Sequence, residues 1–270
     1  MILLLKSHID GVIEADEVHI GYGVYIEPGV HIKSKSVTIG DFAFIGRDVR
    51  VDVPLFRLGD YTKLHNSCFL HGYQPMQIGR NCWIGEHTIL DSIGGLVIDD
   101  NVGIGAHSQV WTHAQHGDIV EGCRFHSSHP VYVGKDAWLV GHCITSMHHM
   151  AERSMALAGS VVTHDTEPNH VYAGVPAVDV TAKTGPQFAV RTTAEKREAL
   201  NGLILAFEQR HPEFAGLISC FASNAEHVTF IDVSDRTYTQ TFSEAEVTFL
   251  RENPLVRVTP ADNPPFVSRS

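Results

Sequence analysis

The stretch that decides the fold runs from Val133 to Thr163 and reads VGKDAWLVGHCITSMHHMAERSMALAGSVVT. An aliphatic or small residue returns in it every six positions without a break, at Val133, Leu139, Thr145, Ala151, Leu157 and Thr163. The same spacing appears upstream in shorter blocks, which begin at Ile20, Ile39, Leu58, Ile78 and Ile98. A period of six fits neither an amphipathic helix, with a period of 3.6, nor a half-buried strand, with a period of two.

This period indicates a short strand followed by a corner. The recurring aliphatic side chain is expected to point into a narrow prism, and glycine or aspartate behind it suits a corner with unusual dihedral angles. Three sides close one coil of about 18 residues, and successive coils stack through backbone hydrogen bonds. A small or β-branched residue four positions after the aliphatic one shares the interior. These residues are Val24, Val30, Val49, Cys82, Thr88, Val102, Ser108, Ala137, Cys143 and Val161. The alternative, a sandwich of evenly spaced strands, has a period of two.

Three motifs, in order along the chain, resemble a known family: VGKDAWL at 133–139, LAGSVVT at 157–163 and YAGVPA at 172–177. They are similar to the I-G-x-x-x-W-I coil, the G-A-G-S-x-V-T segment and the closing A-G-V-P-A of the hexapeptide-repeat acyltransferases, in the galactoside and maltose acetyltransferase branch. The resemblance covers roughly residues 10–185 and implies a left-handed parallel β-helix. The handedness rests on the resemblance alone, because parallel strands are usually joined by right-handed crossovers.

The repeat ends before the chain does, so we expect two parts. Residues 1–185 are predicted to form the β-helix acyltransferase domain, with an excursion loop at 113–132 where the hexads stop. Residues 186–270 are predicted to form a small α/β appendage on a mainly β protein. Its expected elements are a helix from the capping box Thr192–Glu195 to about His211, strands at 227–233, 238–242 and 256–258, and a short helix after Ser243.

Composition narrows the class of protein. A hydrophobic content of 43% and a charged content of 19% are typical of a soluble globular chain. The formal net charge of −11 argues against nucleic acid as a partner. No apolar run is long enough for a membrane span, and Met1–Leu5 lacks the basic residues of a signal peptide. The five cysteines are odd in number and form no C-x-x-C motif, which predicts a reduced, cytoplasmic protein. Cys82 and Cys143 fall on inward positions, so we expect them to pack in the core.

The chemical signal lies at the start of the excursion, in Trp111-Thr112-His113-Ala114-Gln115-His116-Gly117-Asp118. In the family that the chain resembles, a histidine here is the general base that takes a proton from the acceptor as it attacks the acetyl thioester. Imidazole suits this role because its pKa lies near the working pH. Alignment on His116-Gly117 favours His116 as the base, and alignment on Thr112 favours His113. Exposed loop histidines without a role are the alternative.

The resemblance also implies an acceptor site and a coenzyme A site. Glu86 stands where the family has an acceptor-binding asparagine, and Asp91 and Trp111 add a carboxylate and an aromatic face that suit a polyhydroxylated ring. The positions that match contacts to coenzyme A are Gly141, His142, Ala158, Thr163, His164 and, more loosely, Lys183. An ordinary surface lysine and a solvated corner residue are the alternatives for Lys183 and Glu86.

We therefore predict an acetyl-CoA-dependent acetyltransferase that modifies a sugar, nucleotide-sugar or glycan, more readily at oxygen than at nitrogen. Because sites of this family form between subunits, we also predict a homotrimer, and no bound metal. Two other classes remain as alternatives. The first is a zinc β-helix like the γ-type carbonic anhydrases, although the histidine spacing expected there is absent. The second is a non-catalytic β-helix that serves as an assembly scaffold.

Overall fold

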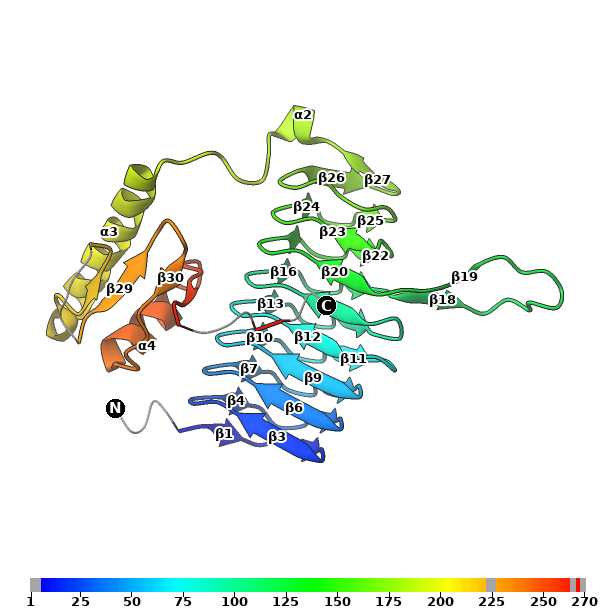
Figure 1. Cartoon of the computed structure of the whole chain (residues 1–270), viewed down its shortest axis with the longest axis horizontal. Helices are drawn as coiled ribbons and strands as arrows, with labels where there is room; N and C mark the ends of the chain where they lie inside the picture. The colour runs from blue at the N-terminus through cyan, green and yellow to red at the C-terminus, as the bar shows by residue number, and fades with distance from the viewer. Residues whose placement is uncertain (1–5, 222–226, 263–265, 268–270) are drawn as a thin grey trace. The chain divides into compact units, whose positions relative to one another are not determined.

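The computed structural model describes residues 6–221, 227–262 and 266–267 (Figure 1). These residues form two compact units: residues 6–188 together with 266–267, and residues 189–262. The first unit is a parallel β-helix, and the second is a small α/β unit. The predicted fold class is confirmed.

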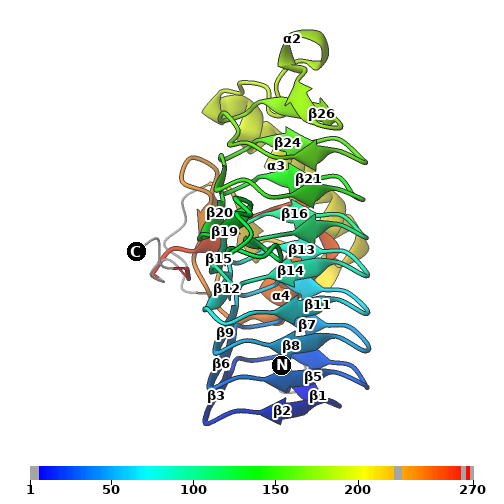
Figure 2. The same ribbon diagram turned by 90° about the vertical axis from the view of Figure 1, so that its right-hand side faces the viewer.

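The β-helix consists of three sheets that form the three sides of a prism (Figure 2). The first sheet contains β1 His8–Ile9, β4 Tyr25–Ile26, β7 Phe44–Ile45, β10 Lys63–Leu64, β13 Trp83–Ile84, β16 Gly103–Ile104, β21 Trp138–Leu139, β24 Met155–Ala156, β26 Val171–Gly174 and β27 Ala177–Asp179. The second contains β2 Val12–Glu14, β5 His31–Lys33, β8 Arg50–Asp52, β11 Phe69–His71, β14 Ile89–Asp91, β17 Gln109–Val110, β22 Ile144–Thr145 and β25 Val161–Val162. The third contains β3 Glu17–Ile20, β6 Ser36–Ile39, β9 Leu55–Leu58, β12 Met76–Ile78, β15 Leu96–Ile98, β20 Val131–Val133 and β23 His149–Met150.

The chain visits the third, first and second sheets in turn and then begins the next coil. In Figure 1 the front strands run from right to left while the coils rise from the N-terminal end, so the β-helix is left-handed. Every pairing within the second and third sheets is parallel, and the final pair β26–β27 of the first sheet is antiparallel. This closing hairpin covers the last coil with the AGVPA motif.

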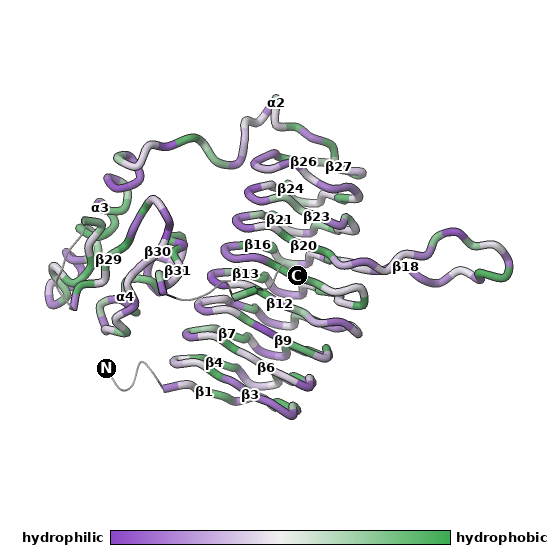
Figure 3. The backbone as a smooth tube through the Cα atoms, in the orientation of Figure 1, coloured by the Kyte–Doolittle hydropathy of each residue, from purple (hydrophilic) through white to green (hydrophobic). Residues whose placement is uncertain are grey.

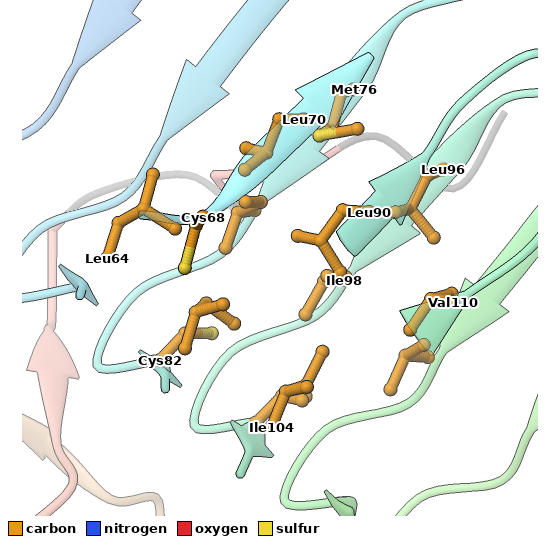
Figure 4. Packing of buried hydrophobic residues seen from close by; sticks show 14 of the residues in the cluster. Leu64, Cys68, Leu70, Met76, Cys82, Leu90, Leu96, Ile98, Ile104 and Val110 are labelled. Atoms are coloured by element: carbon orange, nitrogen blue, oxygen red, sulfur yellow. The ribbon is translucent and has the colours of Figure 1, made fainter. Parts of the chain in front are cut away.

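The core is the ladder of side chains that the hexads place inside the prism. Figure 4 shows Leu64, Leu90 and Ile104 from neighbouring coils, with Cys68 and Cys82 beside them. These aliphatic side chains have no exposed surface, and Cys82 and Cys143 are buried as predicted. Burial of apolar area on this scale is the main favourable contribution to folding.

The coils differ from the expected 18 residues, which explains why the repeat appears in blocks. Ile26 pairs with Ile45 nineteen residues later, and Leu139 pairs with Ala156 only seventeen residues later. The phase predicted beyond Ala151 is therefore wrong by one residue. Ala156 and Val162 are buried in place of Leu157 and Thr163, and Ser160 is buried in place of Val161.

The corner glycines also have a different role from the one expected. A Cβ atom on Gly40 would lie 2.3 Å from Asp60 Oδ1 and 2.6 Å from Asp60 N, on the next coil. Close approach between coils, and not an unusual dihedral angle, therefore requires glycine there. The left-handed corner positions are occupied mainly by other residues, including Asp48, His87 and His107, with φ between 57° and 58°. Asparagine, aspartate and histidine are the non-glycine residues that tolerate this conformation best.

The predicted excursion is a β-hairpin that projects from the corner after β17. Its strands, β18 His113–Gln115 and β19 His126–Ser128, are antiparallel. The loop was predicted to reach residue 132, but Val131 and Tyr132 already pair with β15 in the third sheet. Figure 3 shows hydrophobic segments near the tip of the hairpin. In the loop between β18 and β19, Val120 is 93% exposed and Phe125 is 81% exposed. An apolar tip of this kind indicates a surface that packs against something else.

The second unit contains an 18-residue helix, a shorter helix and a small sheet. Its elements are α3 Thr193–Arg210, η1 Pro212–Phe214, β28 Ile218–Ser219, β29 Thr229–Asp232, β30 Thr237–Tyr238, α4 Glu244–Glu252 and β31 Thr259–Pro260. The Thr192–Glu195 capping box and the helix after Ser243 are confirmed. The strand predicted at 256–258 is wrong, since the strand lies at β31, and β28 was not predicted. No helix in the described part of the chain is long and apolar enough to span a bilayer.

Candidate active site

A buried carboxylate organises the base of the hairpin. Asp91 ends β14, and its side chain has no exposed surface. Its Oδ2 accepts hydrogen bonds from Thr112 N at 2.8 Å and from Thr112 Oγ1 at 2.6 Å. His113 Nδ1 lies 2.8 Å from the same oxygen. The first residues of the hairpin are therefore fastened to the preceding coil.

The charge of Asp91 determines which nitrogen of the neighbouring imidazole donates a hydrogen bond. Burial pushes the pKa of Asp91 upward, but the hydrogen bonds from His113 and Thr112 outweigh it and hold the pKa below its usual value. An ionised carboxylate can only accept, so Nδ1 of His113 donates. In the neutral ring Nε2 is then the basic nitrogen, and the side chain is 21% exposed. This is the arrangement of a histidine base oriented by a carboxylate.

Two further rings lie beside this pair. The Trp111 ring centroid is 6.0 Å from that of His113 and 6.4 Å from that of His71, in edge-on contacts. Trp111 Nε1 donates a hydrogen bond to Gln109 Oε1. His71 Nδ1 lies 4.0 Å from Asp91 Oδ1. His71 and Thr112 were not predicted as site residues, and only the pairing of β11 with β14 places His71 next to Asp91.

His116, the favoured base in the sequence, lies elsewhere. It follows β18 on the projecting arm of the hairpin, where its side chain is exposed. No hydrogen bond or ion pair with another described residue orients its ring. Within one chain, therefore, His113 contacts Asp91 and His116 does not.

Glu86 lies at a different edge of the prism. It sits in the corner before β14, whereas Asp91 ends that strand. Its carboxylate is 44% exposed and lies 3.6 Å from His65 Nδ1. The structure thus places Asp91, Trp111 and His113 at one edge of the second sheet, and Glu86 at the other.

The positions expected to contact coenzyme A divide in the same way. Gly141, His142 and Ala158 follow first-sheet strands and share the edge of Glu86, whereas Thr163 and His164 follow β25. Except for the buried Gly141, all of these residues are exposed. Lys183 is exposed in the single turn α2 Thr181–Thr184.

Three stacked imidazoles connect Glu86 with Gly141 along their shared edge. His87, His107 and His142 follow one another on successive coils, with ring centroids 4.9 Å apart in each pair. This stack was not predicted, because sequence alone does not show which corners are neighbours. No group of three or more histidine, cysteine, aspartate or glutamate side chains within the described ranges is arranged to hold a metal ion.

Part of the chain is similar in sequence to a known acetyltransferase. No family model matches the chain. The galactoside O-acetyltransferase of Escherichia coli (strain K12) is 29% identical over 148 residues, which are 53% of this chain and 66% of that protein. The match therefore spans slightly less than two thirds of the relative. It confirms the resemblance of the chain to the hexapeptide-repeat acetyltransferases that the three motifs indicated.

Solved structures that align with this chain at low sequence identity include three acyltransferases. The UDP-N-acetylglucosamine acyltransferase from Campylobacter jejuni is 16% identical and covers 75% of this chain and 83% of its own, with a TM-score of 0.48. A mutant of AntD, an N-acyltransferase from Bacillus cereus in complex with dTDP and coenzyme A, is 19% identical and covers 72% and 92%, with a TM-score of 0.39. The polysialic acid O-acetyltransferase OatWY is 16% identical and covers 73% and 99%, with a TM-score of 0.39.

Proposed function

We propose that this protein transfers an acetyl group from acetyl-coenzyme A to a hydroxyl group of a sugar-containing acceptor. The similarity to the Escherichia coli galactoside O-acetyltransferase and the three repeat motifs support the reaction class. The observation that carries the proposal is the hydrogen bond between His113 and the buried Asp91. It supplies an oriented base at the foot of the hairpin.

The reaction needs one proton acceptor and no covalent enzyme intermediate. Nε2 of His113 removes the proton from the acceptor hydroxyl while its oxygen attacks the thioester carbonyl carbon. The new C–O bond forms, the C–S bond breaks, and the thiolate of coenzyme A leaves and takes up the proton from the imidazolium. The negative charge of Asp91 stabilises the imidazolium that exists between these two transfers.

The coenzyme A site is proposed along the edges of the last coils of the β-helix, at the corners that follow β21, β24 and β25. Ala158 is exposed and has a short side chain, so a ligand that binds through amide groups can reach the backbone there, next to the buried Gly141. The neighbouring His142, Thr163 and His164 can donate hydrogen bonds, and Lys183 can meet a phosphate group.

The acceptor site is proposed to include Glu86 and Trp111, with the buried Asp91 behind them as the group that orients His113. Because Glu86 lies at a different edge from Asp91, a second copy of the chain is needed to bring both kinds of residue to one acceptor. We therefore propose a homotrimer in which the hairpin of one subunit reaches an edge of the next. The exposed apolar tip of the hairpin supports this assembly. His116, on the same arm, would then face the neighbouring subunit and is the second candidate for the base.

Three variants separate the two histidines. Thiol release from acetyl-coenzyme A is measured with a panel of sugars, nucleotide-sugars, serine and aryl amines for wild type, His113→Ala and His116→Ala. His126→Ala, an exposed histidine on the facing strand β19, is the control. Loss of the base is expected to lower kcat by about two to four orders of magnitude in His113→Ala. Full activity there, with a comparable loss in His116→Ala, would move the base to His116. Turnover confined to serine or aryl amines would refute a saccharide acceptor.

A further inference from the structure

A row of five rings lies on the outer side of the first sheet, in the coils that precede Glu86. We call it the aromatic row. Its members, in order, are His8, Tyr25, Phe44, His65 and Trp83. Successive ring centroids are 4.8, 6.2, 5.8 and 4.8 Å apart. The strands that carry it are β1, β4, β7, β10 and β13, with His65 immediately after β10 (Figure 1).

The row is not part of the core. Tyr25 pairs in register with Phe44, and the inward neighbours of these two residues, Ile26 and Ile45, are fully buried. Tyr25 and Trp83, in contrast, are 44% and 37% exposed. The hexad ladder fills the prism without these rings, which lie outside the core. Exposed aromatic side chains that gather on one face of a protein are a mark of a binding surface.

The row leads directly to the proposed acceptor residue. His65 lies between Phe44 and Trp83, and its Nδ1 is 3.6 Å from Glu86 Oε1. Its Nε2 is buried and has no hydrogen-bond partner among the described residues. Burial lowers the pKa of His65, although the Glu86 carboxylate opposes this shift. His65 therefore lies against Glu86, whose carboxylate is 44% exposed and can accept a hydrogen bond from a hydroxyl group.

Trp83 packs on the backbone at the end of the row, and its ring is tilted by 52° against that of His65. A Cβ atom on Gly85 would lie 2.9 Å from Trp83 Cζ3, so the indole rests against a backbone that carries no side chain. The polar Lys63 stands between Phe44 and Trp83 in the register of the sheet. Apolar rings therefore occur together with groups that can bond to hydroxyls.

We propose that the aromatic row binds an extended oligosaccharide acceptor and guides one of its hydroxyl groups to Glu86. The proposal rests on the proposed function of the same site. Coils repeat at about 4.8 Å along the prism, which is close to the length that one hexose adds to an extended chain. Sugar rings present apolar faces that pack on aromatic rings, and their hydroxyl groups can bond to the amine of Lys63 and the carboxylate of Glu86. The row thus makes the acceptor a polymer or oligomer and not a free monosaccharide.

Binding without acetyl-coenzyme A tests the row independently of catalysis. Isothermal titration calorimetry is performed with linear β-1,4-linked oligomers of glucose and of N-acetylglucosamine, from disaccharide to hexasaccharide. The variants are Phe44→Ala and the more exposed Tyr25→Ala, and the control is Tyr73→Ala, an exposed tyrosine outside the row. Wild-type affinity is expected to rise with oligomer length in at least one series. Each row variant is expected to weaken the hexasaccharide about threefold to tenfold, and the control is expected to bind as wild type does.

Absence of binding in both series, affinity independent of length, or an equal loss in Tyr73→Ala would overturn the proposal. A fall in sedimentation mass in Phe44→Ala and Tyr25→Ala would also overturn it, because the row would then be an interface between copies of the chain. The two proposals fail separately. Length-dependent binding without acetyl transfer refutes the proposed function, and acetyl transfer to small sugars without length-dependent binding refutes the row.

Discussion

Asp91→Asn is the substitution that probes the candidate site most deeply. The side chain keeps its shape, but the charge is lost and one of its two oxygens becomes an NH₂ donor. In the wild type a single oxygen accepts from Thr112 N, Thr112 Oγ1 and His113 Nδ1. An uncharged amide oxygen accepts these three hydrogen bonds more weakly than the carboxylate oxygen does. It also no longer stabilises a protonated His113.

We expect this change to lower both the free energy of unfolding and the catalytic rate. Hydrogen bonds to a charged group contribute about 1.5–3 kcal/mol each, so we expect the free energy of unfolding to fall by about 2–3 kcal/mol at pH 7. Loss of the hydrogen bond that orients the imidazole is expected to lower kcat/KM by about two to three orders of magnitude. KM for acetyl-coenzyme A should change little, because Asp91 is not at the proposed coenzyme A positions.

The pH dependence gives the sign of the stability effect. The folded-state pKa of Asp91 lies below its usual value of 3.8. Asp91 therefore contributes stability at pH values above 3.8, and this contribution is lost as the pH falls through the folded-state pKa. The difference in melting temperature between wild type and Asp91→Asn should be largest at neutral pH and shrink toward pH 3.

The assay combines thermal unfolding at several pH values with steady-state kinetics. Asp165→Asn is the control, because Asp165 also accepts backbone hydrogen bonds, from His148 and His149, but contacts no candidate base. Wild-type kcat/KM in Asp91→Asn, with a stability deficit that is the same at pH 3 and pH 7, would refute the reasoning. Asp91 would then neither orient His113 nor be held ionised by it.

Two further predictions concern stability. Gly40→Ala places a Cβ 2.3 Å from Asp60 Oδ1 and should destabilise the β-helix by about 1–3 kcal/mol or more. Gly202→Ala, in α3, meets no neighbouring element within 4 Å of the new Cβ and should stabilise its unit by about 0.5–1 kcal/mol. Denaturant unfolding measures both changes, and equal effects on the free energy of unfolding would contradict the close-approach argument. Burial raises the pKa of Glu246 despite hydrogen bonds from Thr241 and Thr229, so its contribution is present below 4.5 and lost as the pH rises through the folded-state pKa. Glu246→Gln should therefore raise the melting temperature at pH 7 more than at pH 4, and the reverse order would show that the carboxylate is not destabilised by burial.

The fold was predictable because the hexad period can be recognised in the sequence without knowing which coils are neighbours. Val49, Cys82 and Val102 lie four positions after an aliphatic residue, and all are buried as expected. The phase after Ala151 was not predictable in the same way. Both Ala156 and Leu157 are compatible with an inward position, and only the shortened coil, seen in the pairing of Leu139 with Ala156, decides between them.

The site could be predicted only in part, because its residues come from different coils. The Trp111–His116 segment marked the hairpin, and Asp91 was identified as a site residue. The contacts of His71 with Asp91 and of His65 with Glu86 join residues about twenty positions apart, and they depend on which corners stack. A sequence pattern with blocks of unequal length does not fix that register.

Acetylation of an oligosaccharide by the purified protein is the most direct test of the central claim. The protein is incubated with acetyl-coenzyme A and linear oligosaccharides, thiol release is followed, and the products are analysed by mass spectrometry. We expect a saccharide that carries one added acetyl group and that forms at the same rate as the thiol is released. His113→Ala is expected to form neither product. Absence of acetylated saccharide across the whole panel, with a folded protein, would contradict the claim.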